Sequence, residues 1–278
     1  MDAMPDAFCI SVVAALQSPS PIEDFSSRIW RSAAVRDAKK RLNCALYISY
    51  AEGVGWSYGV WHKQQFLTFL QFKELNRRDV RIGIVFLFSK PYPHKSSFDD
   101  LLKTAYYTRQ CVNMAALSVH DTMEWPQDNL LKLLSIYENA AFREIFACKI
   151  HSSIVELVLP HLTTQFLKKL RVIGPACSPS LKNAVRVVAL HEKWEILKFA
   201  IDNAKFDMEF FAELFHKPVT HAQKYVFSFT EPTFNDFNRD LRTSTTKPLQ
   251  WQRSDGIGIV VKPSRKERFI VHFEQNLC

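Results

Sequence analysis

Strand-like and helical stretches alternate along most of this chain, and that alternation constrains the fold more than any other feature of the sequence. Dense apolar runs such as residues 81–88 are typical of strands, whereas helices are indicated where apolar residues recur every three or four positions. Repeated alternation of helix and strand favours a parallel sheet with helices packed against it. We therefore expect an α/β fold.

The expected order of elements can be read along the chain after residue 44. Alternating apolar residues predict a β-hairpin from 46–50 and 56–60, and a helix is expected over 62–75. Further strands are expected with centres near Ile84, Leu117, Leu157, Val172, Leu197 and Phe227. Helices are expected over 98–111, 128–147, 162–167, 180–191 and 207–215. Residues 256–261 and 268–273 predict a terminal antiparallel hairpin.

The spacing of these strands suggests a repeat. Strand centres recur about every 25–37 residues through most of the chain, with one shorter step between Leu157 and Val172. This irregular period resembles a degenerate leucine-rich-repeat solenoid without its asparagine ladder. In such a fold consecutive strands are neighbours in one predominantly parallel sheet. The residues expected beneath the outer helices are Ile84, Phe86, Val155, Leu157, Leu170, Val172, Ile196 and Phe227.

The sequence lacks the common motifs for metals, nucleotides and membranes. The six cysteines (Cys9, Cys44, Cys111, Cys148, Cys177 and Cys278) form no C-x-x-C pair, and the nine histidines form no H-E-x-x-H motif. Neither G-x-x-x-x-G-K-[ST] nor G-x-G-x-x-G occurs, so we expect no metal and no cofactor. No apolar run is long enough to span a bilayer, and the first residues carry acid rather than a basic signal-peptide region. We expect a cytoplasmic or nuclear protein.

The net charge of +8 is concentrated in two places. The stretch from Arg28 to Arg41 holds six basic residues and one acid, and a second basic cluster runs from Lys262 to Arg268. Basic faces of this kind are typical either of solvated surfaces or of sites that bind phosphate backbones. Nucleic-acid binding is therefore an alternative function.

One short motif points to an enzyme. The segment Gly55-Trp56-Ser57-Tyr58-Gly59 fits G-x-S-x-G, which in serine hydrolases places the nucleophile on a strained turn between a strand and a helix. Only one strand is expected before it, however, and no HGGG-like oxyanion loop is present. Trp56 and Tyr58 also alternate as the second strand of a hairpin would. A serine hydrolase using Ser57 is therefore the weaker alternative, and we expect no enzyme.

The N-terminal segment combines an early proline with two apolar helical patterns. Met4-Pro5 is followed by apolar residues at helical spacing, a Pro/Ser break at 18–21, and a second helix over 22–42 that carries Trp30. This pattern resembles an F-box. Met4 replaces the usual leucine, and the Pro/Ser break departs from the usual link. The residues that carry this resemblance, and that we expect to face a partner, are Pro5, Phe8, Val12, Leu16, Ile22, Phe25 and Trp30.

A wider resemblance covers most of the chain. Met1-Asp2 with Pro5 and Phe8, the Gly55–Tyr58 segment, the 166–174 segment and Trp194 with Leu197 are similar to a lineage-expanded family of nematode F-box-like proteins. That resemblance implies an F-box-like unit at 1–43, which binds a Skp-type adaptor of a cullin-type ubiquitin ligase. It also implies a repeat-like interaction domain at 44–278, which recognises a protein substrate.

Overall fold

The computed structural model describes most of the chain between residues 28 and 201 and selected segments elsewhere. The described residues are Val12, 28–174, 176–191, 194–201, Phe206, Phe210, Glu213, 224–230, 249–252, 257–264 and 268–275. The chain divides into two compact units, Met1–Arg143 and Glu144–Cys278, which we call unit 1 and unit 2. The boundary expected after residue 43 falls inside strand β1 (Leu42–Ala51).

Unit 1 is a mixed sheet with helices, and its first described helix is α2. In order its elements are α2 (Arg28–Lys40), β1 (Leu42–Ala51), β2 (Gly55–His62), β3 (Gln65–Leu67), α3 (Phe69–Glu74), β4 (Val80–Phe88), β5 (His94–Ser96), α4 (Phe98–Arg109), β6 (Val112–His120) and α5 (Gln127–Ser135). The strand order is β6-β4-β1-β2-β3, with β5 pairing separately with β2. Strands β6, β4 and β1 are parallel, whereas β2 is antiparallel to β1, to β3 and to β5.

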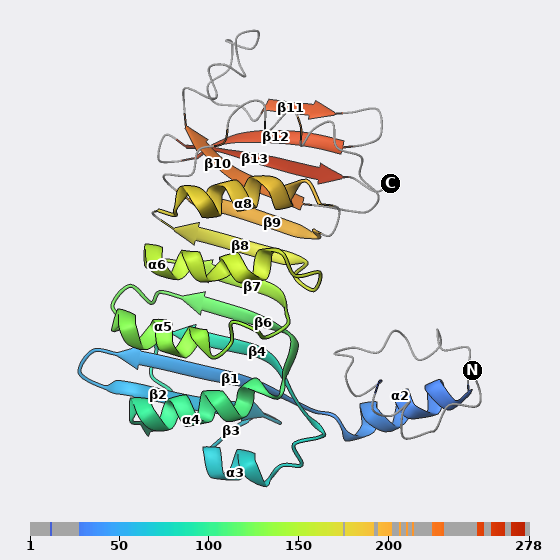
Figure 1. Ribbon diagram of the computed structural model, residues 1–278, viewed down its shortest axis with the longest axis vertical. Helices are drawn as coiled ribbons and strands as arrows, with labels where there is room; N and C mark the ends of the chain where they lie inside the picture. The colour runs from blue at the N-terminus through green and yellow to red at the C-terminus, as the bar shows by residue number, and fades with distance from the viewer. Residues whose placement is uncertain are drawn as a thin grey trace. The chain divides into compact units, whose positions relative to one another are not determined.

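The two faces of this sheet differ. Helices α4 and α5 lie over one face, as Figure 1 shows. We call this the helix-covered face, and it holds Leu46, Val60 and Val85, which are in register with one another and fully buried. The opposite face, which we call the open face, carries Tyr47 and Phe86, which are only half-buried. Neighbouring residues along a strand point to opposite faces, so each strand contributes to both.

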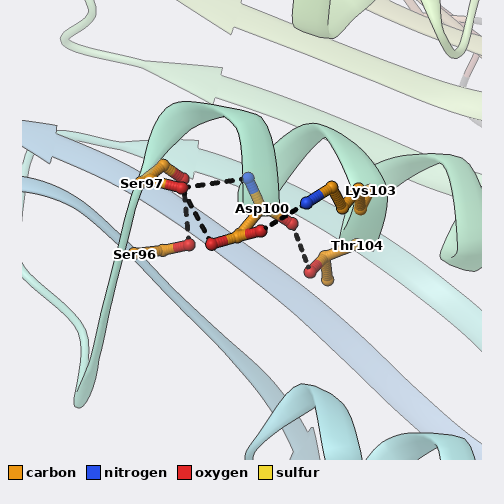
Figure 2. Close-up of polar contacts among 5 residues, drawn as sticks. All are labelled: Ser96, Ser97, Asp100, Lys103 and Thr104. Carbon is orange, nitrogen blue, oxygen red and sulfur yellow. Dashed lines mark hydrogen bonds and ion pairs between the residues drawn. The ribbon is translucent and has the colours of Figure 1, made fainter.

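Helix α4 begins where the sequence provides a cap. The Ser97 hydroxyl accepts the Asp100 N–H at 3.2 Å and donates to the Asp100 carboxylate at 2.9 Å, as Figure 2 shows. Lys103 donates to the same carboxylate at 2.8 Å. These bonds, from Lys103 first and Ser97 second, lower the pKa of Asp100. A capped first turn with acids near its N-terminus explains why the helix expected over 98–111 is present.

Unit 2 repeats the pattern of strand and helix. Its elements are β7 (Phe142–Cys148), α6 (Ser152–Val155), η2 (Glu156–Val158), α7 (Leu159–Leu162), β8 (Lys169–Gly174), α8 (Pro179–Ala189), β9 (Ile196–Ile201), β10 (Lys224–Thr230), β11 (Leu249–Gln252), β12 (Ile257–Ser264) and β13 (Arg268–Gln275). Strands β7, β8, β9 and β10 are parallel neighbours in chain order. Strand β13 pairs antiparallel with β10 and with β12, which confirms the predicted terminal hairpin.

The helix expected over 62–75 is wrong in its first half. Lys63 and Gln64 adopt positive φ angles of 45° and 67°, and the chain turns back so that β3 pairs with β2. Two successive residues with positive φ form the tight turn that suits a two-residue hairpin, usually built from Asn or Gly. Neither residue type is present here, so the turn has no signal in the sequence. Helix α3 then begins after Thr68, whose side chain caps it.

The expectations between 128 and 167 are also wrong in three places. The helix expected over 128–147 begins at Gln127 and ends at Ser135. Residues 142–148, expected to be its second half, form strand β7. No glycine or proline marks the end of this helix in the sequence. The chain leaves the helix through a turn in which the Ala140 N–H donates to the Tyr137 C=O at 2.8 Å. The strand expected around Leu157 is a series of short helical turns, and the helix expected over 162–167 ends at Leu162.

The helical turns between 152 and 162 have a physical reason. Ile154, Val158 and Leu162 are buried and spaced four residues apart, so one side of a helical path faces the core. Their apolar and β-branched composition also fits a strand, which is what misled the sequence interpretation. Leu157, expected to be buried, is half-buried as a result, whereas Val155 is buried.

The class of the fold is confirmed as mixed α/β, with parallel strands in each unit. The leucine-rich-repeat-like solenoid and the F-box-like helical unit stay predictions. The helix expected over 207–215 lies mostly outside the described residues, as does the side chain of Phe227. Within the part of the chain that the structure describes, no helix combines the length and apolar character needed to cross a bilayer.

Candidate interaction surface

The residues predicted to bind an adaptor lie mostly outside the described part of the chain. Val12 is helical and half-buried, and Trp30 lies on α2 with a half-buried side chain. The other predicted residues, Pro5, Phe8, Leu16, Ile22 and Phe25, fall outside the described residues. Adaptor binding through this segment therefore stays a prediction.

Helix α2 carries the first of the two basic clusters. Ala33 and Ala34 are fully buried, whereas the basic residues along the helix are exposed: Arg28, Arg31, Arg36, Lys39 and Lys40. Lys39 and Lys40 occupy the last turn, where positive charge interacts favourably with the helix dipole. In the second cluster, Lys262 belongs to β12 and Arg268 to β13, and the residues between β12 and β13 lie outside the described ones.

Aromatic side chains gather on the open face of unit 1. Tyr47 on β1 is in register with Phe86 on β4, and Trp61 on β2 is in register with Phe66 on β3. We call these four residues, together with Tyr92 from the segment after β4, the aromatic patch. All are half-buried except Trp61, whose side chain is 38% exposed. Aromatic surface left this accessible is a common feature of binding sites.

The rings of the aromatic patch pack against one another. Tyr47 stacks on Phe86 with centroids 4.8 Å apart and planes 13° apart. The Tyr47 ring centroid also lies 5.0 Å from that of Tyr92 and 5.6 Å from that of Phe66, whose ring is nearly perpendicular to it. Trp61 meets Phe66 at 4.7 Å in an edge-to-face arrangement. These are the spacings at which aromatic pairs attract one another, so the patch is preorganised.

Gly59 makes room for this arrangement. It lies opposite Tyr47 on β2, and a Cβ built there would come 2.5 Å from the Phe66 ring. Any side chain larger than hydrogen would therefore displace Phe66 from its place beside Tyr47. The second glycine of the G-x-S-x-G segment thus has a packing role.

Ser57 has a structural role as well. Its side chain is buried, lies 2.6 Å from the Ser49 hydroxyl and accepts the Tyr92 N–H at 2.8 Å. These contacts hold the Tyr92 segment against the sheet. Ser57 sits in the middle of β2, not on a turn between a strand and a helix, so the geometry that a nucleophile elbow requires is missing at this serine.

The flanking residues of Ser57 belong to the core. Trp56 and Tyr58 point to the helix-covered face and are buried. The Trp56 ring lies 4.9 Å from Phe98 at the start of α4, and the Tyr58 hydroxyl accepts the Phe69 N–H at 3.0 Å. The hairpin expected around this segment is confirmed by the antiparallel pairing of β1 and β2.

Positive charge borders the aromatic patch. Lys63 in the β2–β3 turn, Lys90 after β4 and Lys95 on β5 are all exposed, and the Lys90 ammonium lies 5.9 Å from the Phe88 ring centroid. Lys95 is in register with Ser57, so it belongs to a strand position of the open face. No Asp or Glu occupies a strand position on the open face of unit 1, within the residues that the structure describes.

Two tyrosines and a histidine on this face stay neutral near pH 7. Burial raises the pKa of Tyr47, and burial together with the neighbouring Tyr47 raises the pKa of Tyr92 to about 12. Burial lowers the pKa of His120, whose ring lies 6.0 Å from Phe88, despite the nearby Asp121. The positive charge around the patch therefore comes from its lysines.

Unit 2 also has a face opposite its fully buried side chains, and the composition of that face is different. Glu144 on β7 is in register with Lys169 on β8, and Phe146 with Arg171. Arg171 lies 4.0 Å from the Glu144 carboxylate, and Lys169 lies 3.6 Å from that of Glu195. Acids thus lie beside two of the cations on this face, and Lys198 on β9, in register with Arg171, adds a third cation.

Comparisons with known proteins found no relative of this chain. Neither family models, nor curated proteins, nor solved structures gave a significant match to the chain. Among the described residues, no group of three or more His, Cys, Asp or Glu side chains is placed to hold a metal ion. The aromatic patch and its lysines were missed by sequence reasoning, because they come together only through the register of separate strands.

Proposed function

We propose that this chain is a non-enzymatic interaction subunit of the cytoplasm or nucleus. Its N-terminal segment binds a Skp-type adaptor of a cullin-type ubiquitin ligase, and its helix–strand region recognises a protein substrate. The observation that carries the proposal is the open face of unit 1, where half-exposed aromatic rings lie among exposed lysines. Surfaces that bind proteins are enriched in such rings.

Adaptor binding is supported by the resemblance of residues 4–42 to an F-box. An amphipathic helical pair is suited to binding in a groove of a partner. The helical state and partial burial of Val12 and Trp30 are compatible with that use.

The test is co-purification of the full chain with a Skp-type adaptor. We expect the wild type to retain the adaptor and the Pro5→Ala/Phe8→Ala variant to lose it. A matched control is Leu70→Ala/Val187→Ala, which removes two strongly exposed apolar side chains from helices elsewhere in the chain. Equal recovery of the adaptor by all three folded proteins would refute the proposal.

A second candidate function is binding of nucleic-acid backbones by α2. The exposed cations of that helix favour it. Each phosphate contact contributes about −0.7 to −0.9 to the slope of log affinity against log salt concentration. We expect Arg28→Glu/Lys40→Glu to make that slope shallower, and absence of RNA and DNA binding at about 50 mM salt would remove this candidate.

A further inference from the structure

We propose that the open face of unit 1 binds an acidic protein segment that also carries aromatic or large aliphatic side chains. This inference rests on the proposed function, because it names the class of partner that the helix–strand region recognises. It is carried by three features of the face: the exposed parts of its rings, the sign of its charge and its rigidity.

The rings favour apolar side chains over nucleic-acid bases. A base needs a free ring face on which to stack. Here the stacking of Tyr47 on Phe86 covers one face of each ring, and the Trp61 and Phe66 rings meet edge to face. Trp61 is the most exposed ring of the patch, at 38%, and the other four rings are half-buried. Such a surface is complementary to aliphatic or aromatic side chains that pack between the rings.

The charge of the face specifies the rest of the partner. Lys63, Lys90 and Lys95 are exposed around the patch, the described strand positions of the face hold no acid, and Asp121, directly after β6, is the exposed acid near Lys90. Carboxylates in the partner would meet these ammonium groups at the rim, where complementary charge mainly speeds association and excludes basic partners. An apolar centre with a charged rim is the usual organisation of a protein interface.

The face is rigid before any partner binds. The hydrogen bond from the Tyr92 N–H to Ser57 fixes the segment that carries Tyr92 and Lys90. Gly59 lets Phe66 lie against the sheet beside Tyr47. Side chains that are already ordered lose less entropy on association, so the patch is suited to act as an anchor.

The experiment selects peptides from a random display library on the immobilised full-length protein. We expect the selected peptides to be enriched in Asp and Glu together with Phe, Trp, Tyr or Leu. A synthetic peptide of the dominant sequence then serves as the probe for affinity measurements on variants.

Two pairs of variants test the location of the site. Trp61→Ala should weaken the probe peptide at least about tenfold, whereas Tyr106→Ala, which removes an exposed ring from α4, should not change its affinity. Lys90→Glu/Lys95→Glu should weaken it at least about tenfold at low salt and less at high salt. Lys132→Glu on α5 is the matched charge control and should have no such effect.

Several results would overturn the inference. These are a library that yields no enrichment, peptides that are basic or lack apolar residues, and a probe that binds Trp61→Ala as tightly as wild type. An oligouridine or oligothymidine that binds with an affinity lost in Trp61→Ala would show that the face serves nucleic acid instead.

Failure of this inference can be told apart from failure of the proposed function. Adaptor co-purification is measured on the same Trp61→Ala protein, in which the N-terminal segment is intact. If the adaptor is retained and no peptide is selected, only the peptide site is refuted. If acidic peptides bind and the adaptor does not, the peptide site stands and the adaptor-binding role falls.

Discussion

Unit 1 and unit 2 are both built on parallel strands. The sheet faces opposite their buried cores, however, differ in how acidic and basic residues are arranged. In unit 2, Glu144 lies beside Arg171, and Lys169 beside Glu195. In unit 1 the open face carries Tyr47 and Phe86, and its described strand positions hold no acid to offset the lysines at the rim. The unit 2 face holds acids beside two of its cations, whereas the open face of unit 1 has lysines among its rings and no acid at its described strand positions.

The largest expected effect is a loss of stability, which should be greater for substitutions of fully buried residues than for substitutions on the open face. Leu46 in unit 1 and Leu170 in unit 2 are fully buried, and Leu→Ala at either position should lower the free energy of unfolding by about 2–5 kcal/mol. Trp61→Ala, which removes a partly exposed ring, should cost far less. Denaturant unfolding of the three variants measures this. A loss at Trp61 as large as that at Leu46 would mean that the ring belongs to the core.

The next effect concerns the glycine that shapes the aromatic patch. Gly59→Ala should cost about 1–3 kcal/mol, because the new methyl group collides with the Phe66 ring. Gly83→Ala is the matched control, since the nearest atom to its Cβ is a carbonyl oxygen at 4.0 Å. Thermal unfolding of both variants compares the costs. Equal stability of the two would show that Phe66 moves aside freely and that the patch is not rigid.

The next prediction concerns the titration of Tyr92, which is neutral on the open face of unit 1 at ordinary pH. Burial and the adjacent Tyr47 raise its pKa from 10.0 to about 12, so the folded state favours the neutral hydroxyl. The stability that this contributes is complete below pH 10 and is lost as the pH rises towards about 12. Phenolate absorbance should show a component near pH 12 that disappears in Tyr92→Phe and persists in Tyr106→Phe. Its persistence in Tyr92→Phe would contradict the assignment.

The smallest expected effect is in unit 2. The Glu144–Arg171 pair is part-exposed and 4.0 Å apart, so a double-mutant cycle with Glu144→Gln and Arg171→Gln should give a coupling of about 0–1 kcal/mol. High salt should reduce it further. A coupling well above this range would mean that the pair stabilises unit 2 rather than only offsetting charge.

The elements that could be predicted from the sequence are those whose local signals agree with the fold. The hairpin of β1 and β2 was predicted because apolar residues alternate on both sides of Gly53 and Gly55, which take positive φ angles of 76° and 85°. The helix at 98 was predicted from the alternation of elements, and in the structure Ser97 caps it. The turn at Lys63 and Gln64 was missed, because its residues do not favour positive φ.

The open face was missed for a different reason. Strand β4 is apolar on both sides, so Ile84 and Phe86 were expected beneath helices, whereas the structure leaves both half-buried. Ile196 on β9 was expected to be buried and is half-buried as well. Only the register between strands separated in sequence shows that aromatic residues form one patch. Local patterns carry no information about that register.

The most direct test of the open face as a binding site is hydroxyl-radical footprinting of the full chain with and without the selected peptide. Trp61 and Tyr106 are both accessible in the free protein, so each reports on one side of unit 1. We predict that the peptide protects Trp61 and Phe66 from oxidation and leaves Tyr106 and Met123 unchanged. Protection of Tyr106 or of the unit 2 strands, with Trp61 still reactive, would contradict this assignment.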